Sequence, residues 1–205
     1  MLDFLDLKGK NIVIVGISGA IGSSIAIKAS NFGARIFGFD LVQPRKSISL
    51  DFFYLGNATS ELDIKSFINH LGDLNVKIDS VILCMGITGS VVDSENIDIN
   101  DFQNCISSSV ISSTLFIKYF NPLFKQEKTG NFILLSSIAG IRGAALMPAY
   151  TAAKHAINGL MKSFARELGP WGIRLNSISP GIIKSEMAKK IQFSLMLEMT
   201  LAFYI

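Results

Sequence analysis

The sequence is poor in the residues from which metal sites and disulfide frameworks are built. Its 205 residues include only two cysteines, Cys84 and Cys105, and two histidines, His70 and His155. The cysteines lie far apart and form no C-x-x-C motif, and the histidines are isolated from each other. Neither a zinc centre nor a disulfide scaffold is therefore predicted, and we expect no metal in the functional site.

Charge is also scarce. Charged residues make up 17% of the chain, and the formal net charge is +3. Basic residues form no run longer than the pairs Arg45–Lys46 and Lys189–Lys190. Nucleic-acid-binding domains carry clustered positive charge, so this diffuse distribution excludes nucleic acid as an expected partner.

Long apolar runs and a targeting signal are lacking too. The longest uncharged stretch, Asn11 to Ile27, is interrupted by Gly16, Gly19 and Gly22, so no membrane span is predicted. The first six residues contain two acids, where a signal peptide requires positive charge. With 49% hydrophobic residues, the sequence predicts one soluble, cytoplasmic domain over 1–205 rather than a disordered chain.

Short apolar runs alternate with longer helical patterns. The runs are continuous, which is typical of strands covered on both faces of a parallel sheet. Strands are expected over 11–15, 34–39, 80–84, 132–135 and 173–178, and helices over 22–31, 60–71, 100–120 and 149–168. This order predicts an α/β fold with a doubly wound parallel sheet of the Rossmann type, in three α/β/α layers. Ligands of such sheets bind where the carboxyl ends of the strands meet.

A glycine-rich turn, Gly16 to Gly22, joins the first expected strand to the first helix. Glycines allow close approach of a ligand, and the helix start beyond them suits a pyrophosphate. Asp40 ends the second strand, where a carboxylate can accept hydrogen bonds from an adenosine ribose. Its charge would repel a 2′-phosphate, which favours NAD, whereas Arg45 and Lys46 leave NADP open. The alternatives are a purely structural turn and an aspartate that caps it.

Tyr150 and Lys154 lie four residues apart at the start of an expected helix, so they share one face. A phenol has a pKa near 10, and a nearby ammonium, together with an oxidised nicotinamide, would lower it toward neutrality. Ser137 ends a strand thirteen residues earlier, where a hydroxyl can bind a substrate carbonyl. The alternatives are an exposed helix pair without function and a turn serine.

Together these motifs resemble the short-chain dehydrogenase/reductase family, over about 7–187. The segment 130–140 resembles its active-site strand, Tyr150 and Lys154 match its Tyr-x-x-x-Lys motif, and 172–181 resembles the segment leading to the nicotinamide. The resemblance implies hydride transfer between nicotinamide C4 and an alcohol or carbonyl carbon of a small molecule. Tyr150 would be the general acid or base, Lys154 would lower its pKa, and Ser137 would orient the substrate oxygen.

The resemblance also implies a set of residues around the cofactor, including two, Ile183 and Ser185, at the carboxamide. The full set is Gly16, Ser18, Gly19, Ile21, Gly22, Asp40, Asn57, Ala58, Cys84, Gly86, Tyr150, Lys154, Pro180, Gly181, Ile183 and Ser185.

The chain departs from the family pattern at several of these places. Val15 replaces a threonine and Ala20 a glycine in the turn, and 83–86 reads Leu-Cys-Met-Gly where the family has Asn-Asn-Ala-Gly. Asn57 replaces an aspartate beside the adenine. Ser109 takes the place of a catalytic asparagine. A serine has a shorter reach, so we expect a weakened proton relay from Lys154.

The segment 188–205 matches no family motif, whereas the family continues through a substrate lid and a final strand. We therefore expect the last strand to be missing. The segment is predicted either to cover the active site as a helix or to be a foreign tail. The family's four-subunit assembly is in doubt, and pairing through the two long helices at 100–120 and 149–168 stays open. The alternative function is a weakly active or inactive nucleotide-binding protein. The Tyr150–Lys154 pair argues against a third reading, a methyltransferase.

Overall fold

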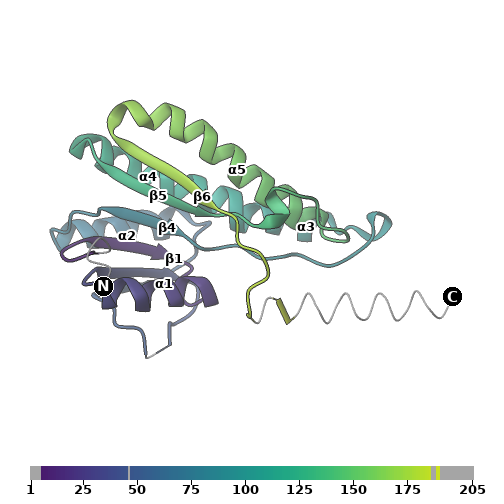
Figure 1. Ribbon diagram of the computed structural model, residues 1–205, viewed down its shortest axis with the longest axis horizontal. Helices are drawn as coiled ribbons and strands as arrows, with labels where there is room; N and C mark the ends of the chain where they lie inside the picture. The colour runs from purple at the N-terminus through teal and green to yellow at the C-terminus, as the bar shows by residue number, and fades with distance from the viewer. Residues whose placement is uncertain (1–5, 46, 186–187, 190–205) are drawn as a thin grey trace.

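The computed structural model describes residues 6–45, 47–185 and 188–189, and in this part of the chain six parallel strands form one sheet. The strands are β1 Asn11–Val15, β2 Arg35–Asp40, β3 Phe52–Leu55, β4 Ser80–Leu83, β5 Gly130–Leu135 and β6 Ile173–Ile178. Their order is β3-β2-β1-β4-β5-β6 (Figure 1), which confirms the predicted doubly wound sheet. The direction of winding reverses between β1 and β4, and that reversal opens a crevice for ligands.

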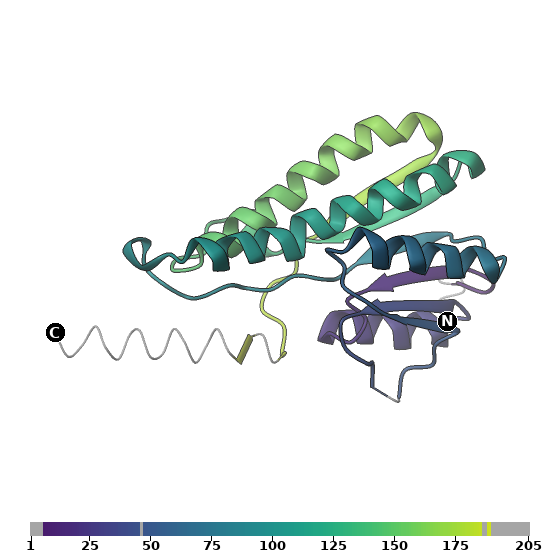
Figure 2. The ribbon, with the colours of Figure 1, turned by 180° about the vertical axis from the view of Figure 1, so that it is seen from behind.

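Helices cover both faces of the sheet, as predicted. The helices are α1 Ala20–Asn31, α2 Glu61–Asp73, α3 Ile99–Ile106, α4 Ser112–Glu127 and α5 Pro148–Leu168. Side chains of α2, α4 and α5 share one core with Val13 and Val15, while α1 packs on Ile12 and Ile14. Figure 2 shows the first group of helices in front of the sheet. Successive residues of β1 therefore point to opposite layers, which explains its unbroken apolar sequence.

Strand β3 was not predicted. It pairs in parallel with β2, from Phe37 beside Phe52 to Asp40 beside Leu55. Its four residues are half-buried or exposed because β3 has a neighbour on only one side among the described residues.

The single helix expected over 100–120 is interrupted. Between α3 and α4 the backbone forms a π-helical turn, Ser107–Ile111. Ser112 Oγ donates a hydrogen bond to Ser108 O at 2.7 Å, and Ser113 Oγ donates one to Ser109 O at 2.6 Å. Hydroxyls that bond to carbonyls one turn back compete with the helical backbone bonds and bend helices. The turn leaves Ser109 buried, with 1% of its surface exposed.

Phenylalanines form a continuous row through the core on the α4 side. Phe39 packs edge-on against Phe116, which stacks on Phe120, and Phe124 continues the row to Phe132 in β5. The centroid distances lie between 5.0 and 6.3 Å, the range of favourable aromatic contacts. The row runs from Phe39, near the carboxyl end of β2, to Phe132 in the middle of β5.

Within the described residues β6 pairs only with β5. Ile173 and Leu175 are buried toward α5, whereas Arg174 and Asn176 on the opposite face are exposed. The predicted absence of a last strand and most of the predicted tail concern residues 190–205, which lie outside the described residues. None of the described helices combines the length and the apolar character that a bilayer crossing requires.

Candidate active site

The carboxyl ends of the central strands meet as predicted, and the backbone after them is tightly joined. Gly16 N donates a hydrogen bond to Phe39 O at 2.9 Å, and Cys84 N donates one to Val15 O at 2.8 Å. The residues that follow β1, β2 and β4 therefore share one edge of the sheet. Among the described residues no group of three or more potential metal ligands lies together.

The glycine turn between β1 and α1 is built for close backbone packing. Gly16 has φ +78°, and a Cβ on it would lie 2.9 Å from the Cys84 carbonyl carbon. A Cβ on Gly22 would lie 2.3 Å from Gly16 O. Gly19 is the N-cap of α1 and provides no side chain to bind the first-turn N–H groups. The turn fits a pyrophosphate, because those N–H groups and the positive end of the helix favour an anion.

Asp40 both caps this turn and faces the crevice. Its carboxylate accepts hydrogen bonds from Ser18 N at 2.8 Å and from Val42 N at 3.3 Å. The interpretation as a capping residue is therefore correct. A carboxylate offers about four acceptor positions. Asp40 consequently keeps acceptor capacity for the hydroxyls of a ribose.

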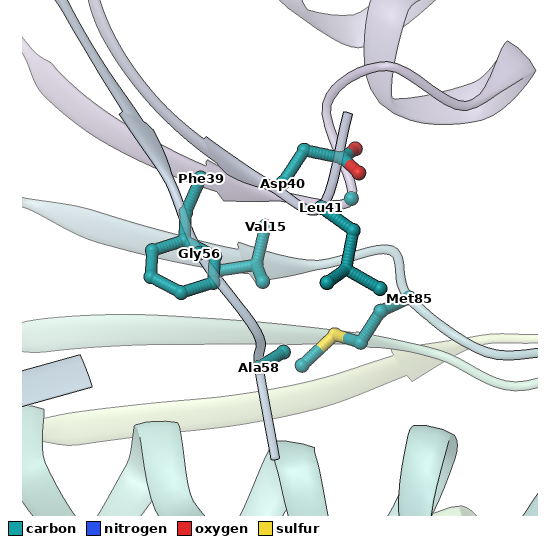
Figure 3. Close-up of a pocket in the computed structure, with 8 residues that line it drawn as sticks. Val15, Phe39, Asp40, Leu41, Gly56, Ala58 and Met85 are labelled. Carbon is teal, nitrogen blue, oxygen red and sulfur yellow. The ribbon is translucent and has the colours of Figure 1, made fainter. Parts of the chain in front are cut away.

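A pocket lies between the glycine turn and the ends of β2 and β3 (Figure 3). Its lining residues are Val15, Gly16, Phe39, Asp40, Leu41, Gly56, Ala58 and Met85. Leu41, Ala58 and Met85 point toward one another across it in Figure 3. Apolar walls with one carboxylate suit an adenosine, whose base is flat and whose ribose carries hydroxyls.

Two residues of this region differ from the sequence interpretation. Asn57 was expected beside the adenine, but it is exposed and is not among the residues that line the pocket. Its Oδ1 accepts hydrogen bonds from Thr59 N and Thr59 Oγ1, so Asn57 stabilises the turn before α2. Gly56 does line it but was missed, because it follows β3, which the sequence did not predict.

The three expected catalytic side chains converge at the ends of β5 and α5. Tyr150, in the first turn of α5, lies beside Ser137, two residues after the end of β5, and the two hydroxyls interact. Lys154 lies one turn further along α5 and is buried, with 5% of its surface exposed. Its Nζ donates a hydrogen bond to Leu135 O at 2.8 Å and lies 5.6 Å from the centroid of the Tyr150 ring. Their sequence spacing predicted this cluster.

Burial governs the titration of the pair. Burial raises the pKa of Tyr150 above its usual value of 10, and the neighbouring Ser137 hydroxyl only partly opposes this increase. In the protein by itself, burial disfavours the charged phenolate more than the neighbouring groups stabilise it. The predicted decrease, which included an oxidised nicotinamide beside the phenol, stays a prediction. Burial also lowers the pKa of Lys154 to about 8.

Ser109 and Gly86 lie beside Lys154. A Cβ on Gly86 would be 2.7 Å from Ser109 Oγ and 3.3 Å from Lys154 Nζ, so the hydroxyl and the ammonium flank the same stretch of backbone. Among the described residues Ser109 Oγ has no hydrogen-bond partner. Buried hydroxyls are normally satisfied, so this one has unused hydrogen-bonding capacity beside Lys154. Its part in a proton relay stays a prediction.

Neither cysteine is poised to react. Burial raises the pKa of Cys84 to about 12 and that of Cys105 to about 11. Both thiols are therefore neutral near pH 7 and behave as small apolar side chains.

The segment after β6 contributes one contact to the cluster. Pro180 O accepts a hydrogen bond from Ile138 N at 2.9 Å, which places the end of β6 beside Ser137. Gly181 and Ile183 are exposed, and Ser185 Oγ accepts a hydrogen bond from Ala188 N. The contact of Ile183 and Ser185 with a carboxamide stays a prediction.

Comparison with known proteins identifies the family. A family model described as enoyl-(acyl carrier protein) reductase matches residues 16–202. The chain belongs to the short-chain dehydrogenase/reductase family. It is 30% identical over 180 residues to the short-chain dehydrogenase/reductase olcF of Penicillium canescens, covering 85% of this chain and 69% of that protein. It is 32% identical over 192 residues to the rat dehydrogenase/reductase SDR family member 6, covering 91% of this chain and 76% of that protein.

Two solved structures of oxidoreductases share the fold. An NAD⁺-bound xylitol dehydrogenase is 25% identical with a TM-score of 0.83, over 91% of this chain and 75% of that chain. A levodione reductase is 22% identical with a TM-score of 0.86, over 92% of this chain and 77% of that chain. The family model and the two relatives confirm the family that the sequence motifs suggested, and the solved structures confirm the fold.

Proposed function

We propose that the protein is an NAD(P)-dependent oxidoreductase that transfers a hydride between the nicotinamide and the alcohol or carbonyl carbon of a small molecule. One observation supports this proposal most strongly. Tyr150, Ser137 and Lys154 converge at the same edge of the sheet as the glycine turn, whose first and last glycines have no room for a Cβ. Family membership alone would not require this chain to keep all three.

Several groups of the chain would hold the cofactor. The N–H groups at the start of α1 would bind the pyrophosphate, the pocket beside Phe39 and Met85 would take the adenine, and Asp40 would accept hydrogen bonds from the ribose. The carboxylate repels a 2′-phosphate, so we favour NAD over NADP.

The proton chemistry follows from the burial of the phenol. Because its pKa is raised, Tyr150 is protonated near pH 7 and can donate its proton to a substrate oxygen that becomes an alkoxide. The Ser137 hydroxyl, which lies beside the phenol, would orient the same oxygen. Lys154, beside Ser109, would return the proton to Tyr150.

Two copies of the chain are proposed to pair through the long helices. Ile111 in the π-helical turn is 46% exposed and Leu123 on α4 is 41% exposed, so this helix presents apolar side chains outward. Light scattering of the full chain, compared with a Leu123→Glu variant, tests the pairing.

A binding assay and an activity assay together test the function. NADH fluorescence titration should detect binding, and a panel of carbonyl compounds should show oxidation of NADH. Tyr150→Phe should keep NADH binding and lose about a hundredfold or more of the turnover, because it removes the proton donor. NADH binding without turnover by the unmodified protein would instead support the inactive nucleotide-binding alternative. A lack of binding of both NADH and NADPH would contradict both.

A further inference from the structure

A polar network behind Ser137 connects three elements and has no part in the chemistry described above. Its centre is Asn158, which lies on α5 one turn after Lys154. Asn158 Nδ2 donates a hydrogen bond to Gly140 O at 2.9 Å. Its Oδ1 accepts a hydrogen bond from Ser177 Oγ, on β6, also at 2.9 Å. The amide therefore joins α5 to the end of β6 and to the segment that follows β5.

That segment is the short turn that begins at Ser137. Residues Ile138–Gly140 form one 3-10 turn, and Gly140 N donates a hydrogen bond to Ser137 O at 2.8 Å. Ala139 N in turn donates one to Ser137 Oγ at 3.2 Å. Pro180 O holds the start of the turn through Ile138 N. Asn158 holds its other end, at Gly140.

The turn has little room to move relative to α5. A Cβ on Gly140 would lie 2.5 Å from Lys154 O and 2.5 Å from Ser136 Oγ, so the two backbones are in direct contact. Ser136 Oγ also donates a hydrogen bond to Lys154 O at 2.9 Å. The position of the Ser137 hydroxyl therefore depends on how the turn sits on the helix that carries Tyr150 and Lys154.

We propose that Asn158 is a positioning residue for the reaction: together with Ser177 it holds the turn 138–140 on α5 and so fixes the Ser137 hydroxyl relative to the Tyr150 phenol. An amide suits this role because it donates and accepts at the same time, which neither a carboxylate nor an alkyl group does. The inference rests on the proposed function. Asn158 has no direct bond to Tyr150 or to the pocket residues, so it would act only through Ser137.

The decisive test is a double-mutant cycle on turnover. Small displacements of a catalytic group can reduce the rate by a factor of about 100, so Asn158→Leu should lower kcat by about 10- to 100-fold. In a Ser137→Ala background the same change should lower kcat by less than about twofold, because the group it positions is already gone. The dissociation constant for NADH should not change in either background.

Matched variants separate positioning from general loss of structure. Ser177→Ala removes the hydroxyl that orients the amide, while Ser177→Thr keeps a hydroxyl and should restore most of kcat. Lys162→Met changes an exposed residue of α5 outside the network and should leave kcat unchanged. Thermal unfolding of each variant shows whether the protein folds, and the Ser177 pair provides the comparison if Asn158→Leu does not.

The outcomes are distinguishable. Equal losses of kcat from Asn158→Leu in both backgrounds, or no difference between Ser177→Ala and Ser177→Thr, would overturn the inference and leave the function intact. If the unmodified protein reduces no carbonyl compound, the proposed function fails and the inference fails with it.

Discussion

Replacing the buried lysine should make the protein more stable while it destroys activity. Lys154 is 5% exposed, and burial lowers its pKa from an ordinary 10.5 to about 8. The unfolded chain therefore binds a proton on this lysine more tightly than the folded chain does. Stability should rise as the pH increases from about 8 to 10.5, because folding then no longer requires a buried charge.

The magnitude follows from the two pKa values. The gap between 10.5 and about 8 corresponds to about 3 kcal/mol of destabilisation at any pH below 8, at 1.36 kcal/mol per pKa unit. Lys154→Met removes the destabilisation caused by the buried ammonium, but it leaves Leu135 O without its hydrogen-bond partner, which costs about 1 kcal/mol. The variant should therefore gain about 2 kcal/mol near pH 7, or about 4–8 °C in Tm for a chain of this size.

Urea and thermal unfolding at pH 7 and pH 10.5 measure the effect. Lys162→Met, on the exposed side of the same helix, is the control and should change Tm by less than about 2 °C, as surface substitutions do. The gain from Lys154→Met should shrink or reverse at pH 10.5. A variant less stable than the unmodified protein at pH 7, or a gain of the same size at both pH values, would refute the reasoning.

Three further predictions concern the turn, the relay and the cofactor. Gly22→Ala should destabilise the protein by about 1–3 kcal/mol, because the new Cβ would overlap Gly16 O. Gly159→Ala on α5, where no atom lies near the new Cβ, should stabilise the protein by about 1 kcal/mol. Equal changes in Tm for the two variants would contradict this prediction. Ser109→Asn should raise kcat by restoring the reach toward Lys154, and an unchanged rate would show that the relay does not limit turnover. Asp40→Ser should tighten NADPH binding relative to NADH in fluorescence titrations, and an unchanged ratio would argue against charge repulsion as the basis of selectivity.

The fold could be predicted where the sequence pattern is set by burial on both faces. The unbroken apolar runs of β1, β2, β4 and β5 required a covered parallel sheet, and the positions of the helices followed. Strand β3 could not be predicted, because Phe52–Leu55 are only half-buried or exposed and take their strand conformation from pairing with β2. The π-helical turn could not be predicted either, because a serine-rich sequence does not indicate which hydroxyls will donate hydrogen bonds to backbone carbonyls one turn earlier.

The site was predictable where geometry is local. Four residues in a helix place Tyr150 and Lys154 on one face whatever the rest of the chain does. The bonds of Asn158 depend on groups 18 and 19 residues away, which leave no pattern in the sequence. The direction of the Tyr150 pKa depends on the balance between burial and neighbours, which only the assembled site determines.

The π-helical turn at Ser107–Ile111 also sets the angular phase of everything that follows it in α4. Such a turn holds about one residue more than an α-helical turn, and each residue rotates a helix by about 100°. Deleting that residue would regularise the helix but swing Phe116, Phe120 and Phe124 away from the interior they fill. A regular helix at this place would therefore require a new arrangement of the phenylalanine row. In evolution, the loss of the π-helical turn and the repacking of these phenylalanines would have to occur together.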